Sequence, residues 1–105
     1  MFDKLRNEKG EVALIITTAF GCGWATENEM HFECIYDPEI ARMVIDGRSP
    51  DDVEALAKKK WPDGNWSAAG DLEIVWLAER TNFQVHNNDG QESIVLRDSQ
   101  HWIEA

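Results

Sequence analysis

Two cysteines and a histidine are the side chains best suited to chemistry in the stretch AFGCGWATENEMHFECI, residues 19–35. Zinc is held by four such ligands; Cys22, His31 and Cys34 supply three, and another histidine would be the fourth. Residues 30–36, however, alternate in the manner of a half-buried strand, so side chains 31 and 34 point to opposite faces. This spacing disfavours a metal site, and we expect no cofactor. Cys34 is expected to be a small core residue.

Cys22 has some of the surroundings of a nucleophile, because the glycines on either side leave its sulfur accessible. Backbone N–H groups in such a loop are able to face an oxyanion. The sequence places no base beside the thiol, and an acidic surface raises the pKa of a thiol. We therefore expect a protein without enzymatic activity. The alternative is a small enzyme or ligand-binding domain with a pocket lined by Cys22, Trp24, Thr26, Asn28 and the Asp89 turn.

Gly21 and Gly23 have a simpler interpretation as residues that shape the chain. The segment GCGWATEN is neither a dinucleotide-binding fingerprint nor a phosphate-binding loop, and no lysine follows it. We expect the glycines to make a bulge or tight turn, while Trp24 folds back over the core. Thr26 and Asn28 then tie the loop through hydrogen bonds from side chain to backbone.

The loop WPDGNW, residues 61–66, carries two of the five tryptophans in the chain. A loop tryptophan either folds onto the edge of the core or is exposed as a contact. Tryptophan is also enriched at the hot spots of protein interfaces. We therefore predict a recognition patch at Trp61, Asp63 and Trp66, with core packing of the two rings as the alternative.

The chain is strongly acidic, with ten basic residues, twenty acidic residues and a formal net charge of −10. No basic residue lies between Lys9 and Arg42. Affinity for phosphates comes from lysine and arginine, so direct binding of nucleic acid is disfavoured. A protein partner with a basic patch is attracted and steered by such a surface. Solubility alone is the other explanation of the charge.

Local patterns predict the first elements that must position these residues. EVALIITTAF, residues 11–20, is rich in β-branched residues and indicates a strand buried on both faces. Residues 30–36 are expected to be its antiparallel partner. Two helices follow: the first begins at the pair Asp37 and Pro38, and the second begins after Ser49.

The last third of the chain changes to a period of two, in short apolar runs from Leu72 to Trp102. Asn-Asp-Gly at 88–90 predicts a hairpin turn, and the whole segment is typical of a four-stranded antiparallel meander. The chain, residues 1–105, is therefore predicted to be one α+β domain in the order β-β-α-α-β-β-β-β. We expect a mostly antiparallel sheet with two helices packed on one face.

The chain has no sequence signal for a membrane or for secretion. Its first ten residues alternate in charge and lack an apolar region, and its longest apolar run, residues 12–16, is too short to span a bilayer. We expect a soluble, cytoplasmic protein that does not contact a membrane and keeps its cysteines reduced.

The segments GCGWATEN and NNDGQESI…HWIEA together resemble a family of small proteins common in bacteriophage and prophage genomes. That family carries a G-x-G-W-S-T-x-N segment after its first strand and an E-Y-D-G-x-E turn before a C-terminal tryptophan. Ala25 stands here in place of the serine, and Asn87 with Asn88 in place of the glutamate and tyrosine. The resemblance implies a phage origin and no particular activity. The matching positions are Gly21, Gly23, Trp24, Thr26, Asn28, Asp89, Gly90, Glu92 and Trp102.

These observations predict a non-enzymatic, phage-type accessory protein that binds a host or phage protein. Its acidic surface and its tryptophan-bearing loop are the expected contacts, and the protein acts as an inhibitor or as a mimic of nucleic-acid charge. A further hypothesis is a structural subunit that forms a homo-oligomer through an edge strand.

Overall fold

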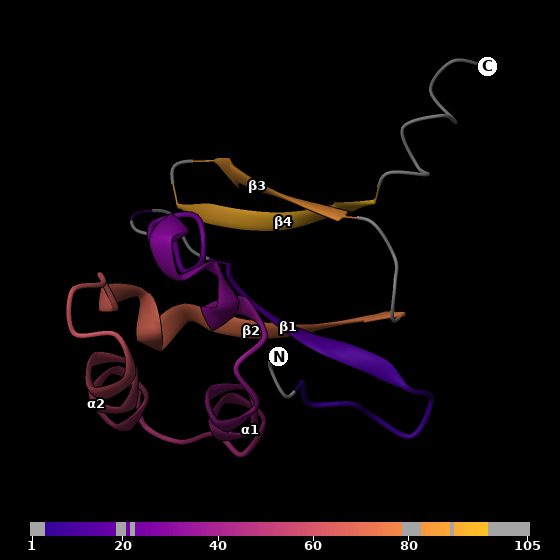
Figure 1. The fold of residues 1–105 in the computed structure, drawn as a ribbon, viewed down its shortest axis with the longest axis horizontal. Helices are drawn as coiled ribbons and strands as arrows, with labels where there is room; N and C mark the ends of the chain where they lie inside the picture. The colour runs from indigo at the N-terminus through magenta and orange to yellow at the C-terminus, as the bar shows by residue number, and fades with distance from the viewer. Residues whose placement is uncertain (1–3, 19–20, 22, 79–82, 89, 97–105) are drawn as a thin grey trace.

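The structure of the chain is a computed structural model that describes residues 4–18, 21, 23–78, 83–88 and 90–96. Its elements are β1 (Glu11–Thr17), the 3-10 helix η1 (Glu29–Ile35), α1 (Pro38–Ile45), α2 (Pro50–Lys60), the 3-10 helix η2 (Ser67–Asp71), β2 (Leu72–Ala78), β3 (Phe83–Asn88) and β4 (Gln91–Leu96). The helices α1 and α2 lie on one side of the β1–β2 pair, and the β3–β4 hairpin lies on the other side (Figure 1).

The predicted α+β class with antiparallel strands is confirmed. β1 pairs with β2 in antiparallel register, with Leu14 opposite Val75, and β3 pairs with β4, with Val85 opposite Ile94. Within the described residues the strands form two separate pairs, so the meander predicted for the last third does not continue from β2 to β3 as one ladder. The strand expected near Trp102 lies outside the described residues.

β1 is the buried strand that its β-branched sequence predicts. Every residue from Val12 to Thr17 is buried, so both faces of the strand are covered. Short β-branched side chains suit this position because they pack well on a pleated surface. The far end of β1 carries Thr17, which lies opposite Leu72 in the pair and begins the region of the candidate site.

The prediction of a strand at residues 30–36 is wrong, because this segment forms most of η1. β1 pairs instead with β2. The backbone of the segment instead closes tight turns, with His31 N donating to the Asn28 carbonyl at 2.8 Å. Two consecutive side chains, Cys34 and Ile35, are both buried, which a strand with one covered face does not allow.

The two α-helices begin where their sequence signals place them. α1 starts at Pro38 after Asp37, and Gly47 lies two residues beyond its end. α2 starts after Ser49, whose Oγ accepts a hydrogen bond from the backbone N–H of Asp52 at 3.3 Å. Capping of this kind satisfies an amide that has no partner within the helix. None of the helices in the described part of the chain has the length and apolar character needed to cross a membrane.

The lysines 58–60 form the last turn of α2, where positive charge faces the negative end of the helix dipole. Lys60 also joins the two helices, since its Nζ lies 3.0 Å from Asp37 Oδ2 and 2.7 Å from Glu39 Oε1. The hydrogen bond from Lys60 lowers the pKa of the Glu39 carboxyl. The helix dipole and these ion pairs therefore explain the only basic cluster of the sequence by its role in the fold.

The hydrophobic core fills the space between the β1–β2 pair, the helices and the glycine-rich loop. It includes two fully buried tryptophans, one from each of the loops singled out in the sequence. The buried members of this core are Val12, Ala13, Leu14, Ile15, Trp24, Ala25, Cys34, Ile35, Ile40, Ala41, Val53, Ala57, Trp66 and Ala69.

Candidate functional site

The GCGWATEN loop and the β3–β4 hairpin meet at the carboxylate of Glu92, which is only 3% exposed. Its Oε1 accepts a hydrogen bond from the backbone N–H of Thr17 at 2.9 Å. Its Oε2 accepts three more, from the backbone N–H groups of Trp24 and Thr26, both at 3.0 Å, and from Thr26 Oγ1 at 2.6 Å. Asn87 Nδ2 in turn donates to Thr26 Oγ1 at 2.6 Å. We call these five residues the Glu92 cluster.

Glycines make this close approach of loop and hairpin feasible. A Cβ added to Gly23 would overlap Thr26 Oγ1 and lie 3.0 Å from Glu92 Oε2. A Cβ on Gly90 would overlap the backbone of Gly21, and Gly90 also has a φ of +93°, which favours glycine. Gly21 thus contacts the hairpin through its backbone and Gly23 through neighbouring side chains, whereas the predicted bulge or tight turn includes Cys22, which lies outside the described residues.

Trp24 and Asn28 hold the rest of the loop against the protein. The ring of Trp24 is fully buried, and its Nε1 donates to the Cys34 carbonyl at 3.1 Å. Asn28 Nδ2 donates to the carbonyls of Trp24 and Asn65, and Asn28 Oδ1 accepts from the backbone N–H of Asn65 at 2.6 Å. The predicted positions of Trp24 and Asn28 are thus confirmed. Thr26 also ties the loop, but its hydroxyl donates a hydrogen bond to the Glu92 carboxylate and not to a backbone group as predicted.

The two tryptophans of the WPDGNW loop differ in their exposure. Trp66 is 1% exposed, and its ring packs between Trp24 at 4.8 Å and Trp61 at 5.3 Å, measured between ring centroids. Its Nε1 donates to the carbonyl of Trp61 at 2.9 Å. Trp66 is therefore a core residue whose ring is not available to a partner, whereas Trp61 is only partly buried.

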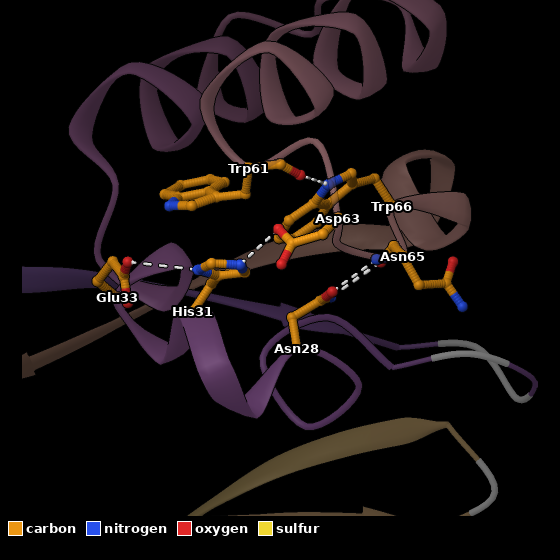
Figure 2. A network of polar contacts seen from close by, with 7 residues as sticks. All are labelled: Asn28, His31, Glu33, Trp61, Asp63, Asn65 and Trp66. Atoms are coloured by element: carbon orange, nitrogen blue, oxygen red, sulfur yellow. Dashed lines mark hydrogen bonds and ion pairs between the residues drawn. The ribbon is translucent and has the colours of Figure 1, made fainter.

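His31 joins η1 to the WPDGNW loop (Figure 2). Its Nε2 lies 2.8 Å from Asp63 Oδ1, and its Nδ1 lies 3.9 Å from Glu33 Oε1. The hydrogen bond with His31 lowers the pKa of the Asp63 carboxyl. The ring of Trp61 lies over the imidazole, with 6.3 Å between centroids. The hydrogen bond between His31 Nε2 and Asp63 therefore holds η1 against the WPDGNW loop.

A shallow pocket of about 260 Å³ opens between the end of the GCGWATEN loop and the WPDGNW loop. Three of its lining residues, Glu27, Glu29 and Asp63, carry exposed carboxylates. Met30 beside them is 85% exposed. Within the described part of the chain, the lining contains no lysine or arginine. The full lining is Thr26, Glu27, Asn28, Glu29, Met30, His31, Asp63 and Gly64. We call it the acidic pocket.

The acidic pocket brings together predicted residues from two loops that were considered separately in the sequence. Thr26 and Asn28 come from one loop and Asp63 from the other. Trp61 lies beside the pocket, where its ring covers that of the lining residue His31. The contact between His31 and Asp63 was not predicted from the sequence. These residues are 32 positions apart, and no motif spacing relates them.

The thiols provide no reactive group among the residues that the structure describes. Cys34 is buried in the core as expected, and burial, helped by the negative charge of Glu92, raises the pKa of its thiol. Cys22 and Asp89 lie outside the described residues, so their predicted places at the loop stay predictions. In the described residues no three histidine, cysteine, aspartate or glutamate side chains are grouped to hold a metal ion.

Comparison with known proteins gives no match to a family model, to a curated protein or to a solved structure. The interpretation of the acidic pocket therefore depends on its own geometry and charge.

Proposed function

We propose that this protein is a non-enzymatic binding protein that takes a basic segment of another protein at the acidic pocket. The observation that carries the proposal is the composition of the lining, which has three exposed carboxylates and, among the described residues, no lysine or arginine. The formal net charge of −10 gives the whole chain a negative electrostatic potential. This potential steers a basic partner toward the protein.

The chemistry of the acidic pocket suits a lysine or arginine side chain. Such a side chain has an apolar stem and a charged end, and it needs both apolar contact and carboxylates. The exposed thioether of Met30 offers the apolar contact within the lining. The partly buried ring of Trp61 lies next to the lining, against His31. Glu27, Glu29 and Asp63 offer the charge.

The polar groups near the glycines support binding over catalysis, because they are already engaged within the protein. The Thr26 hydroxyl donates to Glu92, and the Asn28 amide is hydrogen-bonded to backbone groups. His31 Nε2 is hydrogen-bonded to Asp63 at 2.8 Å. A small enzyme at the GCGWATEN loop would need one of these groups to face a substrate instead.

The phage origin implied by the sequence resemblance suggests what the partner does. A host or phage protein that binds nucleic acid has a basic surface, and an acidic protein seated on that surface blocks it by charge. We therefore propose that the protein inhibits such a partner by imitating the negative charge of nucleic acid.

Charge reversal tests this proposal with a matched pair of variants. We expect Glu27→Lys with Glu29→Lys to weaken binding of an arginine- and lysine-rich peptide at least tenfold at 0.15 M salt. Glu8→Lys with Glu73→Lys changes the net charge equally at exposed sites outside the pocket and is expected to weaken binding less than twofold, because salt screens distant charges. Titration calorimetry or fluorescence anisotropy measures both affinities. An equal loss in the two variants would show that net charge alone causes the binding, and would refute the pocket.

A further inference from the structure

We propose that the GCGWATEN loop and the end of β1 form a preformed carboxylate-binding site, and that Glu92 is its built-in ligand. The site consists of four donors: the backbone N–H groups of Thr17, Trp24 and Thr26, and the Oγ1 hydroxyl of Thr26. It is separate from the acidic pocket in its chemistry, since it attracts anions. The inference goes beyond the proposed function and does not depend on it.

The four donors match the acceptor capacity of one ionised carboxylate, which has only acceptor sites. The proton of the Thr26 hydroxyl is directed to Glu92, because Thr26 Oγ1 accepts from Asn87 Nδ2 on its other side. The orientation of that amide is set in turn, since Asn87 Oδ1 accepts from the backbone N–H of Gly90 at 2.7 Å. The arrangement therefore favours a carboxylate over a neutral group of the same shape.

Contacts that do not involve Glu92 hold the donors in place. Thr17 is fixed by the pairing of β1 with β2, where it lies opposite Leu72. Trp24 is anchored by its buried ring and by the hydrogen bond from its Nε1 to the Cys34 carbonyl. Asn28 closes the loop around Thr26, because its backbone N–H donates to the Ala25 carbonyl and its Nδ2 donates to the Trp24 carbonyl. The donors should thus keep their positions when the carboxylate is removed.

Glu92→Ala provides the test, because this substitution removes a CH₂–COO⁻ group, which has the size of acetate. It leaves four inward-facing donors without a partner in a buried space. We expect sodium acetate to bind there and to raise the melting temperature of Glu92→Ala saturably. At ten times the dissociation constant of acetate, the rise should be roughly 5–10 °C.

Three controls identify the ligand as a carboxylate in this site. Wild type, in which Glu92 fills the site, should not respond to acetate beyond the response to sodium chloride at equal ionic strength. Acetamide, which is neutral and of similar size, should not stabilise Glu92→Ala saturably. Adding Thr26→Val to Glu92→Ala removes one donor and should weaken the acetate response at least fivefold.

A folded Glu92→Ala protein with no saturable acetate response, or with the same response to acetamide, would overturn the inference. If Glu92→Ala is unfolded in plain buffer, the same titration is followed as recovery of the far-UV circular dichroism of the wild type. Recovery that depends on acetate then supports the site, and no recovery in molar acetate contradicts it. Thr26 also lines the acidic pocket, but both readouts measure folding and neither measures peptide binding, so failure here leaves the proposed function unaffected.

Discussion

Glutamine in place of Glu92 is expected to lower the free energy of unfolding by about 2–4 kcal/mol, although the two side chains have nearly the same shape. Glutamine has one acceptor oxygen and one NH₂ group, whereas both oxygens of Glu92 accept hydrogen bonds. If the amide oxygen takes the place of Oε2, the NH₂ group faces the N–H of Thr17 and leaves it unpaired. The remaining three hydrogen bonds also lose the negative charge that strengthens them.

Urea unfolding followed by far-UV circular dichroism measures this loss. Glu73→Gln is the matched control, because Glu73 is an exposed glutamate on β2 and should change stability by less than about 0.5 kcal/mol. Equal stability of Glu92→Gln and Glu73→Gln would mean that the Glu92 cluster contributes nothing to the fold.

Alanine in place of Trp66 is expected to lower the free energy of unfolding by about 3–5 kcal/mol. The ring is 1% exposed and packs between Trp24 and Trp61, so its removal leaves a cavity in the core. The neighbouring backbone cannot fill this cavity easily, since the loop is held by the hydrogen bonds between Asn28 and Asn65. This is a large share of the stability of a small domain.

Trp61→Ala is the comparison for this prediction, because Trp61 comes from the same loop and is only partly buried. Its stability loss should be clearly smaller, at about 1–2 kcal/mol. Chemical unfolding is again followed by circular dichroism, because both variants change the tryptophan fluorescence itself. A loss at Trp66 no larger than that at Trp61 would contradict the core position of Trp66.

Local sequence signals predicted the parts of the fold that local chemistry determines. Asp37 with Pro38 and the capping residue Ser49 sit directly before the two helices. Asn88 ends β3 and Gly90 directly precedes β4, and the β-branched run forms the buried strand β1. In each case the residues that decide the conformation are neighbours in the chain.

Pairings between distant segments were not predictable in the same way. Residues 30–36 alternate like a strand, but β1 pairs with β2, which lies more than fifty positions further along the chain. The choice between these partners depends on the packing of the whole domain, which periodicity does not contain. Residues 30–36, which do not pair with β1, satisfy backbone groups in the short turns of η1.

In the candidate site, too, the residue types were predictable from the sequence and the contacts between distant segments were not. Thr26, Asn28 and Asp63 were selected from the sequence for their residue types and their loops, and they line one pocket. That the two loops are neighbours depends on long-range contacts, among them the pair of His31 with Asp63. The role of Glu92 was likewise hidden, because its four donors come from segments at least 66 positions away.

The coupling between Thr26 and Glu92 tests most directly whether the glycine-rich loop and the hairpin serve to build this fold. The double-mutant cycle uses wild type, Thr26→Val, Glu92→Ala and the double variant, with unfolding free energies from urea titration, because alanine removes the carboxylate that Thr26 contacts. The 2.6 Å hydrogen bond between these side chains predicts a coupling energy of at least about 1 kcal/mol. Additive losses, within about 0.5 kcal/mol, would contradict the contact on which this account depends.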